Sequence, residues 1–189
     1  KEISIAGLIC KDFSFNFSRP IGTESLFDYL RNHKLVTICD VDTRAVVNYI
    51  RENGAMNAVV STNIGMEEKL LKELASSPSM EGLELASKVS TKKPYTVGNS
   101  DSKYRIAAID LGVKKNILHK MVERNMFVKV FPYDTPYKVL EAFKPDGYFI
   151  SNGPGDPLPL KGVQSVAKTI IENNKPLFGI CLGHQIIAL

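Results

Sequence analysis

The sequence has few cysteines and no long hydrophobic run, and both absences exclude classes of protein. Its three cysteines, Cys10, Cys39 and Cys181, are widely spaced in 189 residues, and this spacing gives neither a disulfide framework nor a zinc site. No apolar run approaches the roughly 18 residues that a membrane-spanning helix needs, and the N-terminus lacks the pattern of a signal peptide. We therefore expect a cytoplasmic protein that is not associated with a membrane.

Charge of one sign does not accumulate along the chain. The 24 basic residues exceed the 20 acidic ones, for a formal net charge of +4, but no basic run is longer than the pairs Lys92-Lys93 and Lys114-Lys115. Solvent-exposed surface is the better interpretation of these pairs, and no nucleic-acid partner is expected. The composition, 44% hydrophobic and 23% charged, is typical of a globular protein with one large or two small domains.

Nucleotide-binding loops and metal clusters are also missing. The sequence contains neither the G-x-G-x-x-G pattern of dinucleotide-binding folds nor the G-x-x-x-x-G-K-[ST] pattern of phosphate-binding loops. The three histidines, His33, His119 and His184, are far apart, so a metal site is not expected. We predict that this chain itself binds no cofactor and no metal.

Residues 1–99 predict a smaller α+β domain that ends in a linker. Asp42 or Thr43 is expected to cap a helix rather than to bind a metal. Residues 84–101 lack a sustained period, so we interpret them as linker and place the domain boundary between residues 99 and 100. No catalytic residue is expected before this boundary. Strands are expected over residues 1–10, 35–39 and 56–61, and helices from Thr23, from Asp42 or Thr43, and over 66–76.

From residue 100 the pattern changes to an alternation of strands and helices. Continuous apolar strands separated by amphipathic helices predict an α/β domain with a parallel sheet that is covered on both faces. Function in such sheets gathers at the carboxyl ends of the strands. The strands are expected over residues 105–111, 127–131, 147–151 and 176–180, and the helices over 113–124, 136–143 and 162–173.

A cysteine follows the last of these strands. Residues 179–183, Gly-Ile-Cys-Leu-Gly, have the G-x-nucleophile-x-G form of a nucleophile elbow, with cysteine in the place of serine. The turn from strand to helix is sharp, so the flanking positions must be nearly without side chains, and the nucleophile is held in a strained conformation. The positive helix N-terminus favours the reactive thiolate. Taken alone, the motif fits a buried structural cysteine equally well.

A second loop leaves the preceding strand. Residues 151–157, Ser-Asn-Gly-Pro-Gly-Asp-Pro, contain two glycines around a proline, which let a ligand approach the backbone and can present free amides to an anion. The same dipeptides also occur in ordinary surface turns. One βαβ crossover separates this loop from Cys181, so both emerge at the same edge of the sheet. Facing a reactive cysteine, the loop becomes a candidate oxyanion hole.

The two motifs together, residues 151–157 and 178–185, resemble the class I glutamine amidotransferase family. Three upstream segments, residues 7–9, 40–44 and 110–118, narrow the resemblance to the family of carbamoyl phosphate synthetase small subunits. It runs over essentially the whole chain. The resemblance implies that residues 100–189 form the first part of a flavodoxin-like amidotransferase domain, preceded by the α+β domain.

That family hydrolyses L-glutamine to glutamate and ammonia. The ammonia passes to a large subunit, which makes carbamoyl phosphate for arginine and pyrimidine biosynthesis. The resemblance therefore implies two partners, L-glutamine and the large subunit, and a heterodimer in the cytoplasm. ATP and magnesium are expected on the large subunit.

The resemblance also assigns the site residues. Cys181 is the nucleophile that attacks the carboxamide of glutamine to form a thioester. The backbone amides of Gly153 and Leu182 are expected to form the oxyanion hole. The residues expected to contact glutamine are Gly153, Gly155, Leu182 and Gln185.

Other residues of the family's site have no counterpart in the sequence. The family's catalytic histidine and the glutamate two residues after it fall beyond Leu189, and a glutamine-binding serine falls before Lys1. His184 is not expected to replace that histidine, because it projects away from the nucleophile's face of the helix. We interpret the sequence as a C-terminally truncated fragment that is inactive and unstable when it is expressed alone.

Two alternatives to a glutamine amidotransferase remain open. One is another cysteine hydrolase on a flavodoxin-like fold, which predicts an acidic residue near the cysteine. The other is a non-catalytic scaffold module, since the sequence holds a nucleophile but no base.

Overall fold

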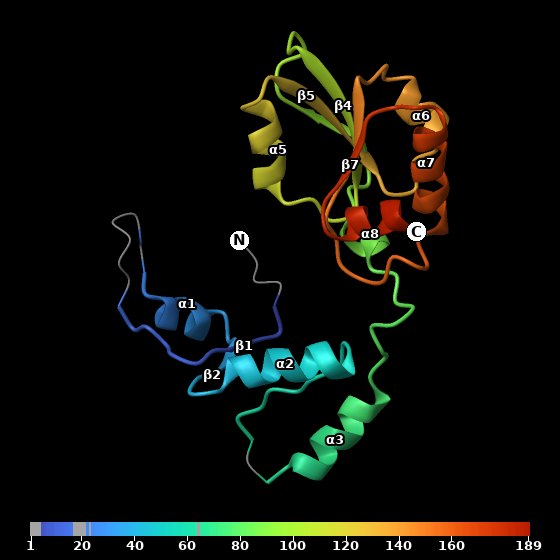
Figure 1. Cartoon of the computed structure of the whole chain (residues 1–189). Coiled ribbons are helices and arrows are strands. Elements are labelled where there is room, and N and C mark those ends of the chain that lie inside the picture. Colours follow the sequence, from blue (N-terminus) through green and yellow to red (C-terminus); the bar gives the residue numbers. More distant parts are fainter. Residues whose placement is uncertain (1–4, 17–21, 23, 64) are drawn as a thin grey trace. The chain divides into compact units, whose positions relative to one another are not determined.

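The chain folds into two compact units, residues 1–79 and 80–189. The computed structural model shown in Figure 1 describes residues 5–16, 22, 24–63 and 65–189. Residues 84–99, which we assigned to a linker at the end of the first domain, belong to the second compact unit. The predicted boundary between the family domains, at residues 99 and 100, stays a prediction.

The first unit contains two short strands and three helices among its described residues. Strands β1 and β2 are parallel, with Leu8 opposite Thr37. The strand predicted over residues 56–61 is wrong, because no ladder forms there in the described part of the chain. The side chain of Asn57 instead donates hydrogen bonds to the carbonyl oxygens of Ser77 and Pro78, at 3.1 and 3.0 Å. The elements are β1 (Gly7–Ile9), α1 (Leu26–Asn32), β2 (Val36–Ile38), α2 (Thr43–Asn53) and α3 (Glu67–Ser76).

Side-chain caps begin two of these helices. The Asp42 carboxylate accepts a hydrogen bond from the amide of Ala45 at 3.0 Å, which confirms the predicted cap of α2. Helix α1 is capped by Ser25, whose hydroxyl accepts from the amide of Asp28. The predicted cap at Thr23 lies outside the described residues.

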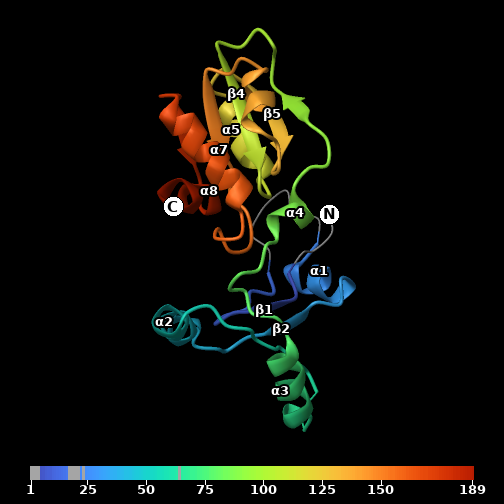
Figure 2. The same cartoon turned by 90° about the vertical axis from the view of Figure 1, so that its right-hand side faces the viewer.

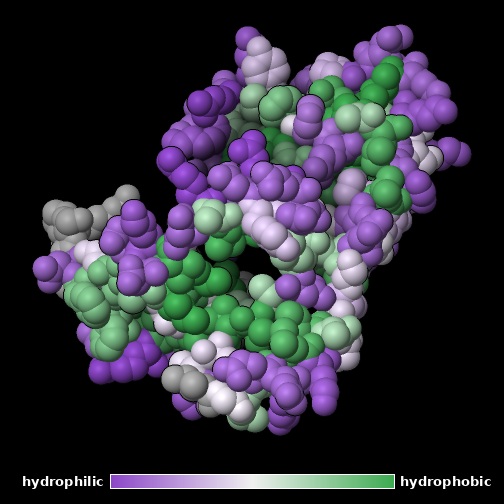
Figure 3. Space-filling view, turned by 60° about the horizontal axis from the view of Figure 1, so that its bottom comes forward, coloured by the Kyte–Doolittle hydropathy of each residue, from purple (hydrophilic) through white to green (hydrophobic). Residues whose placement is uncertain are grey.

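Large hydrophobic side chains of the first unit remain exposed. They gather on one face in the space-filling view (Figure 3), because a sheet of two short strands covers little of the apolar surface that three amphipathic helices present. Leu30 of α1 is buried, whereas the apolar residues of α2 are not. The exposed side chains include Leu26, Phe27, Val46, Val47, Ile50 and Leu71.

The second unit is built on a five-stranded sheet in the order β3-β5-β4-β6-β7. Four strands are parallel, as the sequence predicts, and only β3 is antiparallel. Strand β3 and the short helix before it lie in the predicted linker, so this part of the prediction is wrong. The strands are β3 (Tyr95–Val97), β4 (Tyr104–Asp110), β5 (Met126–Pro132), β6 (Gly147–Ile150) and β7 (Leu177–Gly179), and the short helix is α4 (Ala86–Val89).

Helices cover both faces of this sheet, which confirms the predicted α/β class with a parallel, flavodoxin-like sheet. Figure 1 shows α5 on one side and α6 and α7 on the other, and Figure 2 shows the same unit turned by 90°. The core between the sheet and α7 also includes Leu182 and Ile186 of α8. The helices are α5 (Lys115–Val122), α6 (Tyr137–Glu141), α7 (Lys161–Glu172) and α8 (Leu182–Ala188).

Candidate active site

Cys181 lies in the turn between β7 and α8, where its motif predicts a nucleophile. Its backbone has φ 52° and ψ −112°, a left-handed conformation that costs a non-glycine residue about 1–3 kcal/mol. The residue is exposed to solvent. The structure therefore shows the strained, exposed cysteine that a nucleophile elbow requires.

The two glycines of the motif make this turn possible. A Cβ atom on Gly179 would lie 2.5 Å from the carbonyl oxygen of Gly183, and one on Gly183 would collide with the carbonyl of Ile150. The amide of Gly183 donates to the carbonyl oxygens of Ser151 (3.2 Å) and Ile180 (3.0 Å). Helix α8 is thus packed directly against the end of β6, which confirms that the flanking positions must lack side chains.

The loop after β6 adjoins this elbow. Strands β6 and β7 are parallel with Ile150 opposite Gly179, so residues 151–157 and Cys181 emerge at the same edge of the sheet, as predicted. Within the part of the chain that the structure describes, the backbone N–H groups of Gly153 and Leu182 donate to no protein atom. These amides are available to an oxyanion, although their predicted role stays a prediction.

The first half of this loop packs against the turn after β4. The hydroxyl of Ser151, a residue with no exposed surface, accepts from the amide of Leu111 at 2.8 Å and donates to the carbonyl oxygen of Asn152 at 2.7 Å. The side-chain amide of Asn152 donates a hydrogen bond to the carbonyl oxygen of Gly112 at 2.9 Å. A Cβ atom on Gly153 would collide with the carbonyl of Leu111, so only glycine fits there.

The second half of the loop packs against residues 82–85. Gly155 has φ 92°, and a Cβ atom there would lie 2.7 Å from the carbonyl oxygen of Leu83. The Asp156 carboxylate accepts hydrogen bonds from the amides of Gly82 and Leu158, both at 2.8 Å. These two bonds hold the pKa of the Asp156 carboxyl below its ordinary value.

The lowered pKa of Asp156 predicts that its anchor to Gly82 fails in acid. The bond contributes stability that is fully present above the unfolded-state pKa, about 3.9, and is lost as the pH falls through the lower folded-state pKa. In full-length protein, the difference in Tm between wild type and D156A should therefore shrink as the pH falls from about 6 to about 2. Thermal unfolding across this range measures it, and a difference that stays constant would contradict the anchor.

The remaining predicted site residues lie on α8. The side chain of Leu182 is only 1% exposed, so this residue can face a substrate only through its backbone. Gln185 and His184 are exposed, and the amide of Gln185 donates to the carbonyl oxygen of Cys181 at 3.0 Å. The predicted contacts of Gly153, Gly155, Leu182 and Gln185 with glutamine stay predictions.

Asp110, which has no role in the site predicted from the sequence, holds the turn against which the loop of residues 151–157 packs. It ends β4 and is nearly buried. Its carboxylate accepts hydrogen bonds from the amides of Thr91, Gly112 and Val113, at 2.8 to 2.9 Å. An aspartate two residues before a glycine, at the end of an apolar strand, is the sequence signal of such a turn.

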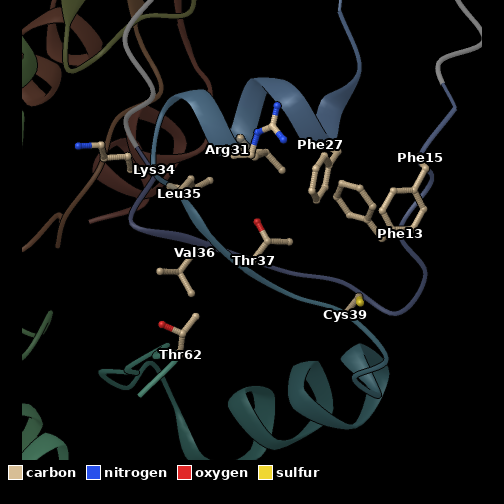
Figure 4. A pocket seen from close by; sticks show the side chains of 11 residues that line it. Phe13, Phe15, Phe27, Arg31, Lys34, Leu35, Val36, Thr37, Cys39 and Thr62 are labelled. Carbon is tan, nitrogen blue, oxygen red and sulfur yellow. The ribbon is translucent and has the colours of Figure 1, made fainter. Parts of the chain in front are cut away.

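A separate cavity of about 430 Å³ lies in the first unit (Figure 4). Phe13, Phe15 and Phe27 form one wall, and the rings of Phe13 and Phe15 meet edge to face at 5.1 Å. None of the predicted site residues lines this cavity. The described residues contain no cluster of three or more potential metal ligands, and none of their helices is long and apolar enough to cross a membrane.

Two family models match separate parts of the chain. Residues 107–189 match the model described as Glutamine amidotransferase class-I. Residues 1–60 match the model described as Carbamoyl-phosphate synthase small chain, CPSase domain. The first match contains the cysteine elbow and the loop of residues 151–157.

Curated proteins named carbamoyl phosphate synthase small chain are similar to most of the chain. That of Synechococcus sp. is 40% identical over 97% of this chain and 50% of its own length. That of Parasynechococcus marenigrum is 44% identical over 88% and 47%, respectively, and that of Pseudomonas syringae pv. tomato is 38% identical over 97% and 53%. The chain therefore spans about half the length of the curated relatives it matches.

Proposed function

Because the chain combines a class I glutamine amidotransferase domain with the CPSase domain of carbamoyl-phosphate synthase small chains, we propose that it supplies the nucleophile for hydrolysis of L-glutamine to glutamate and ammonia. The observation that carries the proposal is the strained, exposed Cys181 beside a loop with a free backbone amide. A nucleophile with oxyanion donors at one sheet edge is what acyl transfer through a thioester requires.

The proposed reaction has two stages. The Cys181 thiolate attacks the carboxamide carbon of glutamine, and the N–H groups of Gly153 and Leu182 donate to the oxygen that becomes negative in the tetrahedral intermediate. The intermediate collapses as the carbon–nitrogen bond breaks, and the nitrogen takes up the proton that the thiol released. Ammonia departs, and a thioester remains on Cys181. Water then attacks the thioester, which releases glutamate and restores the thiol. We assign no general base among the described residues.

Substrate recognition is proposed for the same two loops. Gly155 adopts φ 92°, a conformation in which a side chain would be strained, and the exposed side chain of Gln185 can offer a carboxamide. We propose that both contact glutamine, together with Gly153 and Leu182.

We further propose that the ammonia passes to a large synthetase subunit, which forms carbamoyl phosphate for arginine and pyrimidine biosynthesis. The match of residues 1–60 to a domain of carbamoyl-phosphate synthase small chains supports this partner. ATP and magnesium act on the large subunit in this proposal, and the complex works in the cytoplasm.

The test is glutaminase activity of the full-length protein. Glutamate and ammonia should form in equal amounts from glutamine, and a chloroketone analogue of glutamine should alkylate Cys181, as mass spectrometry of the labelled peptide shows. Glutamine itself should slow the labelling, because it occupies the same site. Labelling that glutamine does not slow would favour another cysteine hydrolase, and the absence of both reactions would favour a scaffold module.

A further inference from the structure

Ser151 joins three segments at the edge of the sheet. Its hydroxyl accepts from the amide of Leu111, which follows β4, and its backbone carbonyl accepts from the amide of Gly183 in α8. The same hydroxyl donates to the carbonyl oxygen of Asn152. A serine with no exposed surface therefore connects the turn after β4, the loop after β6 and the helix of the nucleophile.

The bond to Asn152 fixes more than one atom. The Asn152 carbonyl and the Gly153 N–H belong to one planar trans peptide, so the two groups point in opposite directions. When the Ser151 hydroxyl holds that carbonyl oxygen at 2.7 Å, the direction of the Gly153 N–H is set as well. A rotation of this peptide would turn the N–H away and leave the carbonyl in its place.

The order of the strands gives that direction. Strand β6 lies between β4 and β7, and the Ser151 hydroxyl is bonded on the β4 side, to Leu111. The Asn152 carbonyl, bonded to the same hydroxyl, is therefore tied to the β4 side, and the Gly153 N–H points away from that hydroxyl. The bond from the Asn152 side chain to Gly112 keeps the same residue on the β4 side.

From these contacts we infer that Ser151 is a positioning residue, whose hydroxyl holds the Gly153 amide in place for the oxyanion of the reaction. This inference rests on the proposed glutaminase function. The hydroxyl itself does not touch the substrate. It acts only through the peptide between Asn152 and Gly153.

Ser90 provides a matched control for Ser151. It is 5% exposed, and its hydroxyl accepts from the amide of Tyr133 at 3.0 Å and donates to the carbonyl of the next residue, Thr91, at 3.4 Å. Both serines thus make the same pair of bonds, one to a distant amide and one to the following carbonyl. Only Ser151 precedes the proposed oxyanion donor.

The experiment compares S151A with S90A in full-length protein. Both variants leave a backbone amide without its acceptor, so both should lower Tm. S151A should also lower kcat for glutamine by about tenfold to hundredfold, because a misdirected oxyanion donor weakens binding of the transition state, while KM changes less than about threefold. S90A should keep the wild-type kcat.

The rate at which iodoacetamide alkylates Cys181 distinguishes a misdirected Gly153 amide from a distorted elbow. This displacement forms no oxyanion, so its rate should be the same in wild type and S151A. Should S151A fail to fold, S151C carries the test, since its thiol nearly retains the volume but bonds more weakly, and its kcat should lie below that of wild type. A wild-type kcat in S151A or S151C would overturn the inference. So would an equal loss of kcat in S90A, or an equal loss of the alkylation rate in S151A. An inactive wild-type enzyme would instead overturn the proposed function itself.

Discussion

Replacing Cys181 with serine in the full-length protein is expected to abolish the release of ammonia from glutamine. A serine hydroxyl does not ionise near neutral pH, and the elbow presents it to the carboxamide without an activated electron pair. Loss of a nucleophile lowers kcat by about 10⁴-fold or more. A coupled glutamate assay measures the loss, and undiminished activity in C181S would remove Cys181 as the nucleophile.

The same variant should leave the fold intact. Cys181 is exposed, and exposed substitutions change the free energy of unfolding by less than about 0.5 kcal/mol. Cys39 is also an exposed free cysteine, but it lies in the first unit. C39S should therefore retain full activity. Comparison of C181S with C39S then shows whether the loss of activity is specific to Cys181.

Replacing Gly183 with alanine is expected to destabilise the second unit strongly. The added Cβ would collide with the carbonyl of Ile150 and lie 2.9 Å from that of Ser151. Neither backbone carbonyl can move without disturbing the end of β6. Overpacking of this kind costs about 1–3 kcal/mol and occasionally more, and the displaced helix would also move Cys181, so activity should be lost as well.

Gly162 offers the matched control for that change. It lies in the first turn of α7, and a Cβ atom there would meet nothing within 4 Å. Alanine in a helix is more stable than glycine by about 0.5–1 kcal/mol, so G162A should raise the free energy of unfolding. Urea denaturation of both variants gives the comparison, and a G183A protein as stable as wild type would show that α8 can shift.

The parts of the fold that local patterns encode could be predicted from the sequence. The parallel strands of the second unit are continuous apolar runs, and the elbow depends on two glycines at a fixed spacing from Cys181. Strand β3 has only three residues and pairs with Val128 to Val130, so nothing within its own segment distinguishes it from a linker. Its existence depends on a partner more than thirty residues away.

Hydrogen bonds between distant residues, in the site and outside it, could not be predicted in the same way. The apolar run of residues 56–61 predicted a strand, yet the carboxamide of Asn57 is bonded to the chain after α3. The Ser151 hydroxyl likewise accepts a hydrogen bond from the amide of Leu111, forty positions earlier. Side-chain hydrogen bonds between residues so far apart produce no local pattern in the sequence. Only the folded structure shows them.

The bond between Gly82 and Asp156 has a mechanical consequence. The chain enters the second unit at Met80, and two residues later the amide of Gly82 donates a hydrogen bond to Asp156, in the loop that begins beside the nucleophile. The amide of Asp156 donates to the carbonyl oxygen of Leu83, and Glu84 pairs with Gly155. A pull on the chain before Met80 would therefore reach Asp156 and its loop before it reached any strand of the sheet.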